Sequence, residues 1–357
     1  MQKIDGSGVN RLWKPAEKRK NIFMKKLSKL SLCVCVLLIL ALFPIEAANA
    51  AAIAEPNISS RAAVVIDFET GEILFERNAD VPMVPASMTK AMSAFVVFEE
   101  LERGNLTLDT VVTISENAAR VSRGNVPGIQ GNHSIPLSAG SQHRVEELLF
   151  RMLGPSSNGS CVAMAEHISG SEAAFAVRMN ESAAAIGMWA DFNNSHGGFT
   201  NHTTARSMGI LVREFILRYP EVLELTGTRS RFGFTNTNQL LSGGSFFYQG
   251  ADGFRTGTTN EAGFCLAATA ERNGRRIVTV VMNAPSNQGR YNDTHRLLDF
   301  GFAESARRDA ERMIDVSLNG EVLDFDVSAR RINGYSMAPI RTIFEALGVI
   351  SPWLSIP

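Results

Sequence analysis

The chain has 357 residues, 45% hydrophobic and 20% charged, which indicates a folded globular protein of about two domains and excludes a disordered or collagen-like chain. Residues 1–50 contain nine Lys/Arg and three Asp/Glu, whereas the remainder contains 26 Lys/Arg and 33 Asp/Glu. Because binding to a phosphate backbone needs a basic surface, a remainder with a net charge of −7 argues against a nucleic-acid-binding protein.

Residues 1–50 have the pattern of a leader followed by a signal peptide. Three lysines between positions 25 and 29 precede an apolar run over 30–43, which is too short to span a bilayer and suits a signal-peptide core. Residues 48–50 (Ala-Asn-Ala) then match a small-residue cleavage site. We therefore expect an exported protein whose mature chain starts near Ala51, with Met24 as a second candidate start. A buried helix is the alternative interpretation.

The first elements after the leader form a predicted hairpin. Ala62–Asp67 and Ile73–Phe75 are short apolar runs separated by Glu69-Thr70-Gly71, which is typical of two strands joined by a turn. A helix-compatible apolar stretch then runs from Ala91 to Leu101.

One lysine stands out after residue 50: Lys90 accompanies 25 arginines. Either residue supplies positive charge, but arginine cannot lose its proton, whereas a desolvated lysine can. Lys90 is therefore a candidate general base, and chance survival of a surface lysine is the alternative.

Ser87 stands three residues before Lys90, at the start of the predicted helix. Residues three apart lie on one face of a helix, so a neutral Lys90 can take the proton of Ser87 while the hydroxyl attacks a carbonyl. The Ser-x-x-Lys spacing alone is weakly specific, but no other such pair occurs after residue 50.

The middle of the chain predicts two helices, Val145–Met152 and Cys161–Ile168, joined by a loop over Gly154–Gly159. Cys161 lies in the second of these helices and Cys265 in a later apolar run. Their surroundings favour two buried free thiols, and a disulfide between them stays open.

The last part of this region predicts strands and a helix. Gly263–Ala270 and Ile277–Asn283 are core strands by pattern, and Asn273-Gly274 between them is a strong hairpin signal. Residues 292–306 predict a helix. Strands at both ends of the region with helices between them favour an α+β fold.

Residues 307–315 are highly charged and predict a linker, with the last turns of the preceding helix as the alternative. Beyond them, residues 316–322 and 339–348 are similar to the small stalk-like domain named after the N-terminal domain of copper amine oxidases. This segment has no His or Cys, so the resemblance implies no copper. Because the pattern of that domain continues beyond Pro357, we expect 316–357 to be a partial, truncated stalk-like domain that cannot bury a core of its own.

Three short motifs follow one another along the chain. Ser87-x-x-Lys90 is followed 69 residues after Ser87 by Ser156-Ser157-Asn158, and Arg255-Thr256-Gly257 begins 97 residues after Asn158. This order resembles the penicillin-binding and serine β-lactamase superfamily. The flanking segments are similar to the exported D-alanyl-D-alanine carboxypeptidases, the low-molecular-mass penicillin-binding proteins, over approximately residues 55–305. These segments are Glu146–Leu149, Cys161–His167, Asn194–Gly197, Thr203–Arg206 and Asp252–Gly257.

The resemblance implies a β-lactamase/transpeptidase-like fold over 51–306, with an antiparallel sheet from both chain ends, flanking helices and a helical subdomain. It implies an extracytoplasmic serine peptidase without metal or cofactor. The implied substrate is the peptidoglycan stem peptide ending in D-Ala-D-Ala, and β-lactam antibiotics would be covalent inhibitors. Peripheral association with the membrane or wall would fit this location.

The resemblance also implies roles for the motif residues. Ser87 would be the nucleophile and Lys90 its base, Ser156 would relay a proton to the leaving amine, and Asn158 would orient Lys90 and the substrate amide. The backbone N–H groups of Ser87 and Thr258 would form the oxyanion hole.

The third motif would bind the substrate's carboxylate through Arg255 and Thr256, and Gly257 would let the substrate backbone approach the strand. Arg255 departs from the family's lysine, but arginine binds a carboxylate in bidentate fashion. Arg290 matches a family arginine near the substrate carboxylate, and a solvated loop arginine is the equally weighted alternative.

Two other functions stay open. A serine β-lactamase commonly carries a Glu-x-x-Leu-Asn pattern after the second motif, and none of Glu166, Glu172, Glu181 and Glu221 stands in one. A catalytically weak penicillin-binding wall module, in which Arg255 spoils turnover, is the second alternative.

Overall fold

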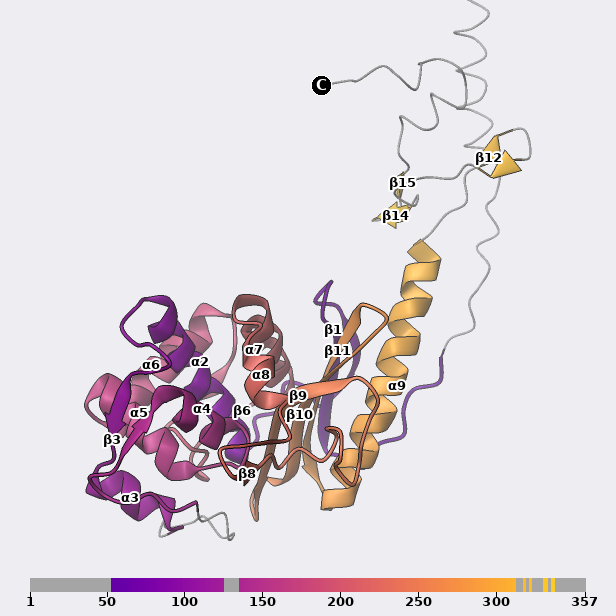
Figure 1. Cartoon of the computed structure of the whole chain (residues 1–357). Coiled ribbons are helices and arrows are strands. Elements are labelled where there is room, and N and C mark those ends of the chain that lie inside the picture. Colours follow the sequence, from indigo (N-terminus) through magenta and orange to yellow (C-terminus); the bar gives the residue numbers. More distant parts are fainter. Residues whose placement is uncertain are drawn as a thin grey trace, which may run out of the picture. The chain divides into compact units, whose positions relative to one another are not determined.

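The structure is a computed structural model that describes residues 53–124 and 135–312, together with four two- or three-residue strands beyond them (Figure 1). The expected signal peptide at 1–50 lies outside the described residues. So does the expected stalk-like segment 316–357 apart from those short strands, β12 (Ser317–Leu318), β13 (Glu321–Val322), β14 (Arg330–Ile332) and β15 (Tyr335–Met337).

A five-stranded antiparallel sheet has the strand order β2-β1-β11-β10-β9. The strands are β1 (Ala62–Asp67), β2 (Ile73–Arg77), β9 (Ala251–Thr259), β10 (Gly263–Arg272) and β11 (Arg275–Ala284). Ala62 pairs with Met282, so the first and last strands of the sheet's chain lie side by side at its centre. This confirms the predicted α+β fold with a sheet built from both chain ends.

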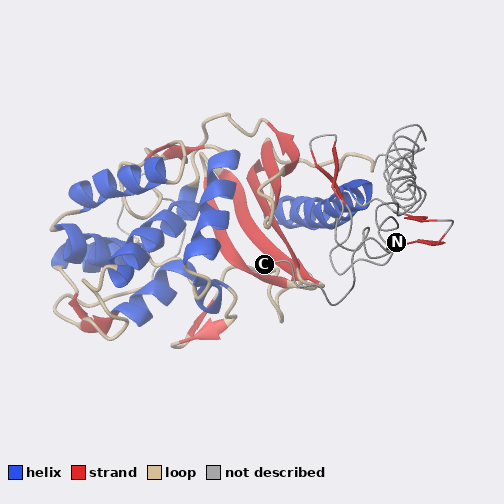
Figure 2. Cartoon of the chain, turned by 90° about the horizontal axis from the view of Figure 1, so that it is seen from above, coloured by secondary structure: helices blue, strands red, loops and turns tan. Residues whose placement is uncertain are grey.

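The strands follow their sequence patterns closely. Every residue of β1 is buried, because helices cover both faces of the sheet, as the view from above shows (Figure 2). The predicted hairpin turn has Asn273 at φ 52° and Gly274 at φ 72°, the two left-handed residues that a type I′ turn requires.

The helices gather mainly on one side of the sheet, and α9 covers the other (Figure 1). The 3₁₀ turn Ala86–Met88 leads into α2 (Thr89–Glu102), which is buried along nearly its whole length. The other helices are α3 (Glu116–Ser122), α4 (Val145–Leu153), α5 (Asn158–Ser169), α6 (Glu172–Ala185), α7 (Ala205–Arg218), α8 (Val222–Thr226) and α9 (Asn287–Arg312). Short two-stranded ribbons are β3–β4 (Val111–Thr113, Gln142–Arg144), β5–β6 (Ala190–Asp191, His202–Thr203) and β7–β8 (Ser230–Arg231, Phe234–Thr235).

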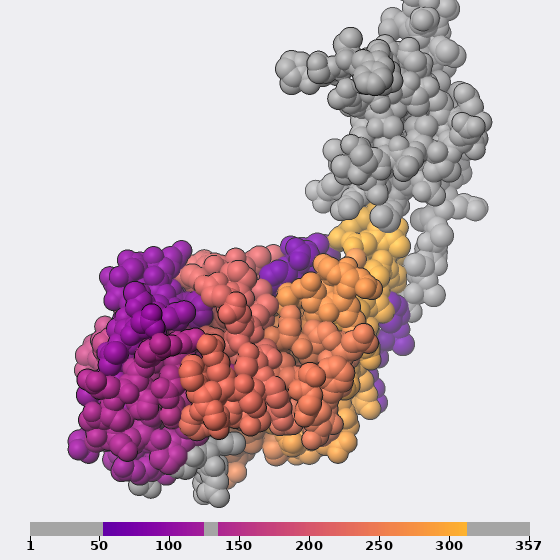
Figure 3. All heavy atoms as spheres, in the orientation of Figure 1, coloured from indigo at the N-terminus to yellow at the C-terminus, as the bar shows by residue number. Residues whose placement is uncertain are grey.

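Alternate residues of β1 divide the core between the two faces of the sheet. Val64 and Ile66 pack with the helical region that contains α2, whereas Ala63 and Val65 pack with the apolar side chains of α9. In the space-filling view the magenta helical residues and the orange residues of the later chain form one continuous packed surface (Figure 3).

Helix α9 includes residues 307–312 of the linker predicted at 307–315, and residues 313–315 lie outside the described residues. Residues 307–312 are the last turns of α9. Arginines of this segment form ion pairs with an acid one helical turn away and with an acid just before β2, and these pairs stabilise the helix. Arg307 and Arg308 pair with Glu304, and Arg312 pairs with Glu72. None of the helices in the described ranges combines the length and apolar character that a bilayer crossing needs.

Candidate active site

Ser87 lies on the tight turn that precedes α2, between two glycines from distant parts of the chain. A Cβ on Gly197, whose φ is 98°, would lie 2.0 Å from the carbonyl oxygen of Ala86. A Cβ on Gly257 of β9 would lie 2.6 Å from the carbonyl oxygen of Pro85. Gly257 is predicted to leave room for the substrate backbone, and in the structure its α-carbon also packs against the serine turn.

Lys90 lies one helical turn after Ser87, as its spacing predicts. Its Nζ is 2.9 Å from the Ser87 Oγ and donates a hydrogen bond of 2.5 Å to the backbone carbonyl of His196. The side chain is completely buried, and this desolvation, reinforced by the positive charge of Arg255, lowers the pKa of Lys90 to about 7. A substantial fraction of Lys90 is therefore neutral near neutral pH and can accept the serine proton.

Ser156 approaches Ser87 from the loop between α4 and α5. Its hydroxyl donates a hydrogen bond of 3.0 Å to the Ser87 Oγ, and its backbone adopts a φ of 80° that serine rarely takes. Ser157 caps α5 by accepting a bond from the backbone N–H of Ser160, which fixes this loop. The loop thus holds a second hydroxyl against the nucleophile.

Among the described residues, Asn158 lacks the contact with Lys90 that one part of its expected role requires. It is the first residue of α5 and is nearly buried, but no hydrogen bond joins its amide to Lys90 within the described part of the chain. The partner that orients Lys90 there is the carbonyl of His196, which sequence analysis did not identify. A backbone carbonyl leaves no sequence signal beyond the Asn194–Gly197 segment in which it lies.

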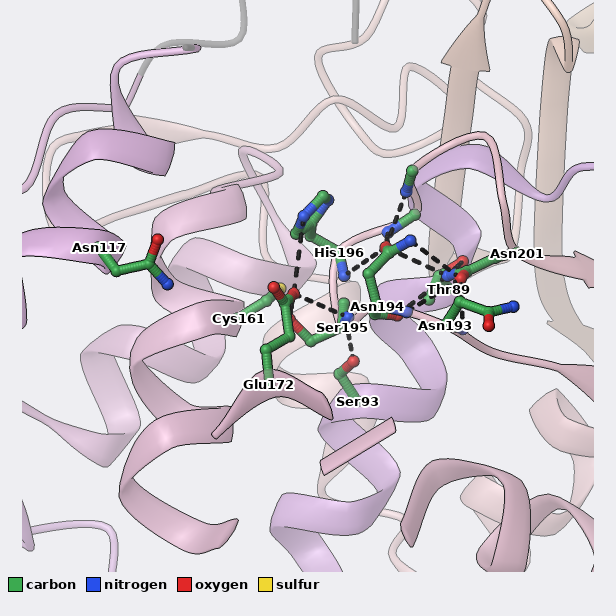
Figure 4. A network of polar contacts seen from close by, with 12 residues as sticks. Thr89, Ser93, Asn117, Cys161, Glu172, Asn193, Asn194, Ser195, His196 and Asn201 are labelled. Carbon is green, nitrogen blue, oxygen red and sulfur yellow. Dashed lines mark hydrogen bonds and ion pairs between the residues drawn. The ribbon is translucent and has the colours of Figure 1, made fainter. Parts of the chain in front are cut away.

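A dense hydrogen-bond network holds that carbonyl in place (Figure 4). The side-chain oxygen of Asn194 accepts bonds from the backbone N–H groups of His196, Gly197 and Gly198. Glu172 accepts two further bonds from the N–H and hydroxyl of Ser195, at 3.0 and 2.6 Å. Burial and the nearby charge of Lys90 lower the pKa of His196 to about 3, so its imidazole is neutral and forms no ion pair with Glu172.

Arg255 lies on β9 and is buried to 1% exposure. Its Nη1 donates to the hydroxyls of Thr237 and Thr256, at 2.9 and 3.2 Å, while Nε and Nη2 have no partner among the described residues. Burial lowers the pKa of Arg255 to about 10, so the group stays charged at neutral pH. A buried guanidinium with free donors and no acidic partner in the described chain is suited to an anionic ligand.

Thr237 is a site residue that sequence analysis missed. Its hydroxyl lies 2.6 Å from that of Thr256, and its backbone carbonyl accepts a bond from Tyr291. It lies in a loop without a motif, so only the folded chain brings it to β9.

Arg290 is a buried anchor of β9 and not a solvated loop residue. Its Nη1 donates to the carbonyls of Gly257 and Cys265, at 3.1 and 3.2 Å, and to the Thr258 hydroxyl at 2.9 Å. The side chain is 7% exposed. Arg290 therefore fixes the strand segment that ends at the exposed Thr258.

Both cysteines of this region are buried free thiols. Desolvation raises the pKa of Cys161 to about 12 and that of Cys265 to about 11, so neither thiol is a nucleophile at neutral pH. Across residues 53–124 and 135–312, no group of three or more metal-binding side chains is close enough together to hold a metal ion.

Together these groups can perform acyl transfer. A serine hydroxyl contacts a lysine that can be neutral and a second hydroxyl, and a buried arginine lies on the adjacent strand edge. This is the set needed to activate a nucleophile, protonate a leaving group and hold an anionic substrate terminus.

Comparison with known proteins agrees with this geometry. A family model described as D-alanyl-D-alanine carboxypeptidase matches residues 48–286. The chain is 33% identical over 257 residues to the D-alanyl-D-alanine carboxypeptidase DacF of Bacillus subtilis and 32% identical over 254 residues to DacC of Escherichia coli. Each alignment covers 69% of this chain and 62% of the relative, so the chain spans less than two thirds of these relatives' length.

Solved structures show the same fold. The penicillin-binding protein PBP3 of Streptococcus pneumoniae, described as a peptidoglycan synthesis regulatory factor, has a TM-score of 0.64 and 32% identity, covering 69% of this chain and 72% of that one. Cefotaxime-bound penicillin-binding protein D2 of Listeria monocytogenes has a TM-score of 0.61 and 31% identity, covering 70% and 100%. The chain belongs to the D-alanyl-D-alanine carboxypeptidase family, with the transpeptidase-like fold of the low-molecular-mass penicillin-binding proteins.

Proposed function

We propose that the protein is an exported serine D-Ala-D-Ala carboxypeptidase that removes the terminal D-alanine from peptidoglycan stem peptides. The observation that carries this proposal is the contact of 2.9 Å between the Ser87 Oγ and a completely buried Lys90 whose pKa is lowered to about 7. Family membership supports the substrate class, because the relatives are named for this activity.

The first step forms an acyl-enzyme. Neutral Lys90 takes the proton of Ser87, and the Oγ attacks the carbonyl carbon of the penultimate D-alanine. The backbone N–H groups of Ser87 and Thr258 stabilise the oxyanion, an interaction worth about 3–4 kcal/mol for each donor removed.

The tetrahedral intermediate then collapses as the C–N bond breaks. Ser156, which contacts the Ser87 Oγ at 3.0 Å, passes a proton from Lys90 to the leaving nitrogen, and D-alanine departs. Water next attacks the ester, Lys90 accepts its proton, and Ser87 recovers its hydroxyl hydrogen as the shortened peptide leaves.

Arg255 selects substrates that end in a carboxylate. Its unpartnered Nε and Nη2 supply two donors for the terminal carboxylate, and Thr256 supplies a hydroxyl beside them. Asn158, at the start of α5, is proposed to contact the substrate amide, and Arg290 acts through the strand by fixing Gly257 and Thr258.

β-Lactam antibiotics would acylate Ser87 in the same way, and slow release of that adduct is proposed. The two acids that follow the second motif most closely are held by other residues: Glu172 by Ser195, and Glu166 by Ser115 and Asn117. This arrangement favours a carboxypeptidase over a β-lactamase, because it supplies no evident carboxylate base for rapid deacylation. Peptidoglycan lies outside the cytoplasmic membrane, so this function agrees with the signal peptide expected at 1–50 and with action in the wall or at its membrane face.

The test measures D-alanine release from diacetyl-L-Lys-D-Ala-D-Ala together with the intact mass of the protein after mixing with benzylpenicillin. We expect release and a stable adduct on Ser87, both lost in Ser87→Ala and both retained in the exposed control Ser138→Ala. Release by Ser87→Ala would overturn the assignment. Rapid destruction of the antibiotic without an adduct would identify a β-lactamase, and an adduct without D-alanine release would identify a penicillin-binding module.

A further inference from the structure

A small pocket opens where β9 ends, beside the segment that leads into the Ser87 turn. Its volume is about 160 Å³, and its lining includes Arg61, the segment Pro82–Val84, His202, the turn Glu261–Ala262 and Asn283. Pockets for drug-sized molecules start at roughly 300 Å³, so this one is suited to a single side chain.

Hydrogen bonds fix the backbone around the pocket on two sides. Met83 and Thr203 exchange two backbone hydrogen bonds of 2.8 and 3.0 Å, which hold the segment before Ser87. The Asn283 amide donates to the carbonyl of Ala262 at 3.1 Å and holds the β9–β10 turn. The pocket is therefore a formed feature of the fold.

Two opposite charges line this pocket without neutralising one another. Arg61 and Glu261 are both exposed, and within the described residues neither side chain forms an ion pair or a hydrogen bond. Most charged residues of α9 and β11, such as Arg276 and Glu304, do form ion pairs. Arg61 and Glu261 are thus free to bind a ligand that carries both signs of charge.

The proposed substrate runs towards this pocket. Its carboxylate lies at Arg255 and its reacting carbonyl at Ser87 and Thr258, so the preceding residues continue along β9 towards Thr259 and the turn. The edge of β9 can take an extended peptide, since this strand has one neighbour in the sheet. At about 3.4 Å per extended residue, the residue before the D-Ala-D-Ala unit reaches the end of the strand.

We propose that the Arg61–Glu261 pocket binds the side chain of the residue before the D-Ala-D-Ala unit and selects one that ends in both an ammonium and a carboxylate group. Glu261 attracts the ammonium group and Arg61 the carboxylate. This inference rests on the proposed carboxypeptidase function. It adds a specificity for the residue before D-Ala-D-Ala, which the three motifs leave undefined.

The test compares three Nα-acetylated peptides that end in D-Ala-D-Ala. The residue before this unit is acetylated lysine, lysine with a free ammonium group, or meso-diaminopimelic acid, whose side chain carries both charges. We expect kcat/KM to be highest for the diaminopimelic acid peptide, exceeding that of the acetylated peptide by roughly fivefold to tenfold, as two partly exposed ion pairs allow.

Two single variants assign that preference to the pocket. In Glu261→Gln the advantage of the free ammonium group over the acetylated side chain is expected to disappear. In Arg61→Gln the advantage of diaminopimelic acid over free lysine is expected to disappear. The exposed control Glu69→Gln removes the same charge elsewhere and should keep the wild-type ratios.

The same peptides are also compared as competitors of benzylpenicillin acylation, which requires binding but no release of D-alanine. Equal values for the three peptides in both assays, or ratios unchanged in both variants, would overturn the pocket's role. Competition in the expected order without D-alanine release would support the pocket and refute the carboxypeptidase function.

Discussion

Two buried cations approach the serine from two different regions, and they are used in opposite ways. Lys90 comes from the helical region and Arg255 from the edge of the sheet; both are essentially inaccessible to solvent, and neither has an acidic partner in the described chain. The same desolvation brings the pKa of Lys90 to about 7 but leaves Arg255 charged. On the roles proposed above, burial therefore yields a base at Lys90 and a carboxylate site at Arg255, according to residue type.

The largest expected effect comes from replacing Lys90, which can lose its proton, by an arginine, which cannot. Lys90→Arg keeps a positive charge but cannot lose a proton, so we expect kcat/KM for D-alanine release to fall by roughly 10³-fold. Steady-state kinetics on the diacetylated tripeptide measure the loss, and circular dichroism checks the fold. Full activity in this variant would show that Lys90 is not the base.

The opposite substitution on the sheet, Arg255→Lys in β9, should lower kcat/KM only slightly. Arg255→Lys keeps a charge for the carboxylate, so kcat/KM is expected to stay within about tenfold of wild type, whereas Arg255→Gln should lose about 100-fold, in line with the 2–5 kcal/mol typical of breaking a buried charge pair. A peptide amidated at its C-terminus provides the control, because Arg255→Gln should barely change its slow hydrolysis. Equal losses in both variants would argue against a carboxylate site.

The two regions meet at the turn that contains Ser87, and a substitution at Gly197 measures how closely the chain packs there. Gly197→Ala puts a methyl group onto the carbonyl oxygen of Ala86, so we expect a loss of about 2–4 kcal/mol in the free energy of unfolding measured with urea. Gly187→Ala is the matched control, since its φ of 74° is also left-handed but nothing lies within 4 Å. It should cost only about 1–2 kcal/mol, the strain of the backbone alone. Equal losses of unfolding free energy in Gly197→Ala and Gly187→Ala would mean that the Ser87 turn moves aside without cost.

The change that needs no substitution is the pH dependence. Because the neutral form of Lys90 is the proposed base and the pKa of Lys90 is about 7, acylation by benzylpenicillin should level off above this pH and slow about tenfold for each pH unit below it. Arg255 stays charged over this range, so carboxylate binding should change little. Stopped-flow acylation rates from pH 5 to 9 give the profile, and a rate independent of pH would contradict the lowered pKa.

Local patterns predicted much of the fold and the centre of the site. The strand Ala62–Asp67 has the predicted bounds, the Asn273-Gly274 turn has the predicted conformation, and the spacing of Ser87 and Lys90 places their side chains in contact. These features depend on residues close together in the chain. The periodicity of one helix or the chemistry of one turn is enough to specify them.

What the sequence did not reveal depends on tertiary contacts. The carbonyl of His196 and the hydroxyl of Thr237 reach Lys90 and Arg255 only when distant segments pack together. The sequence leaves Arg290 open between an arginine near the substrate carboxylate and a solvated loop arginine, and only the packing of α9 places its guanidinium against the carbonyls of Gly257 and Cys265. Charge alone also misled at 307–312, where arginines that resembled a linker form ion pairs along a helix.

The pairing of β1 with β11 has a consequence for how this chain matures. The strand at residues 62–67 lacks its central neighbour until residues 275–284 have been made, and the turn with Ser87 lacks its support from β9 until residues 251–259 are present. Sheets closed by such distant partners fold slowly and expose unpaired edges meanwhile. Under the proposed export and function, a chain that crosses a membrane from its N-terminus would carry Ser87 out before β9 and β11, and acyl transfer could begin only after residue 284 has followed.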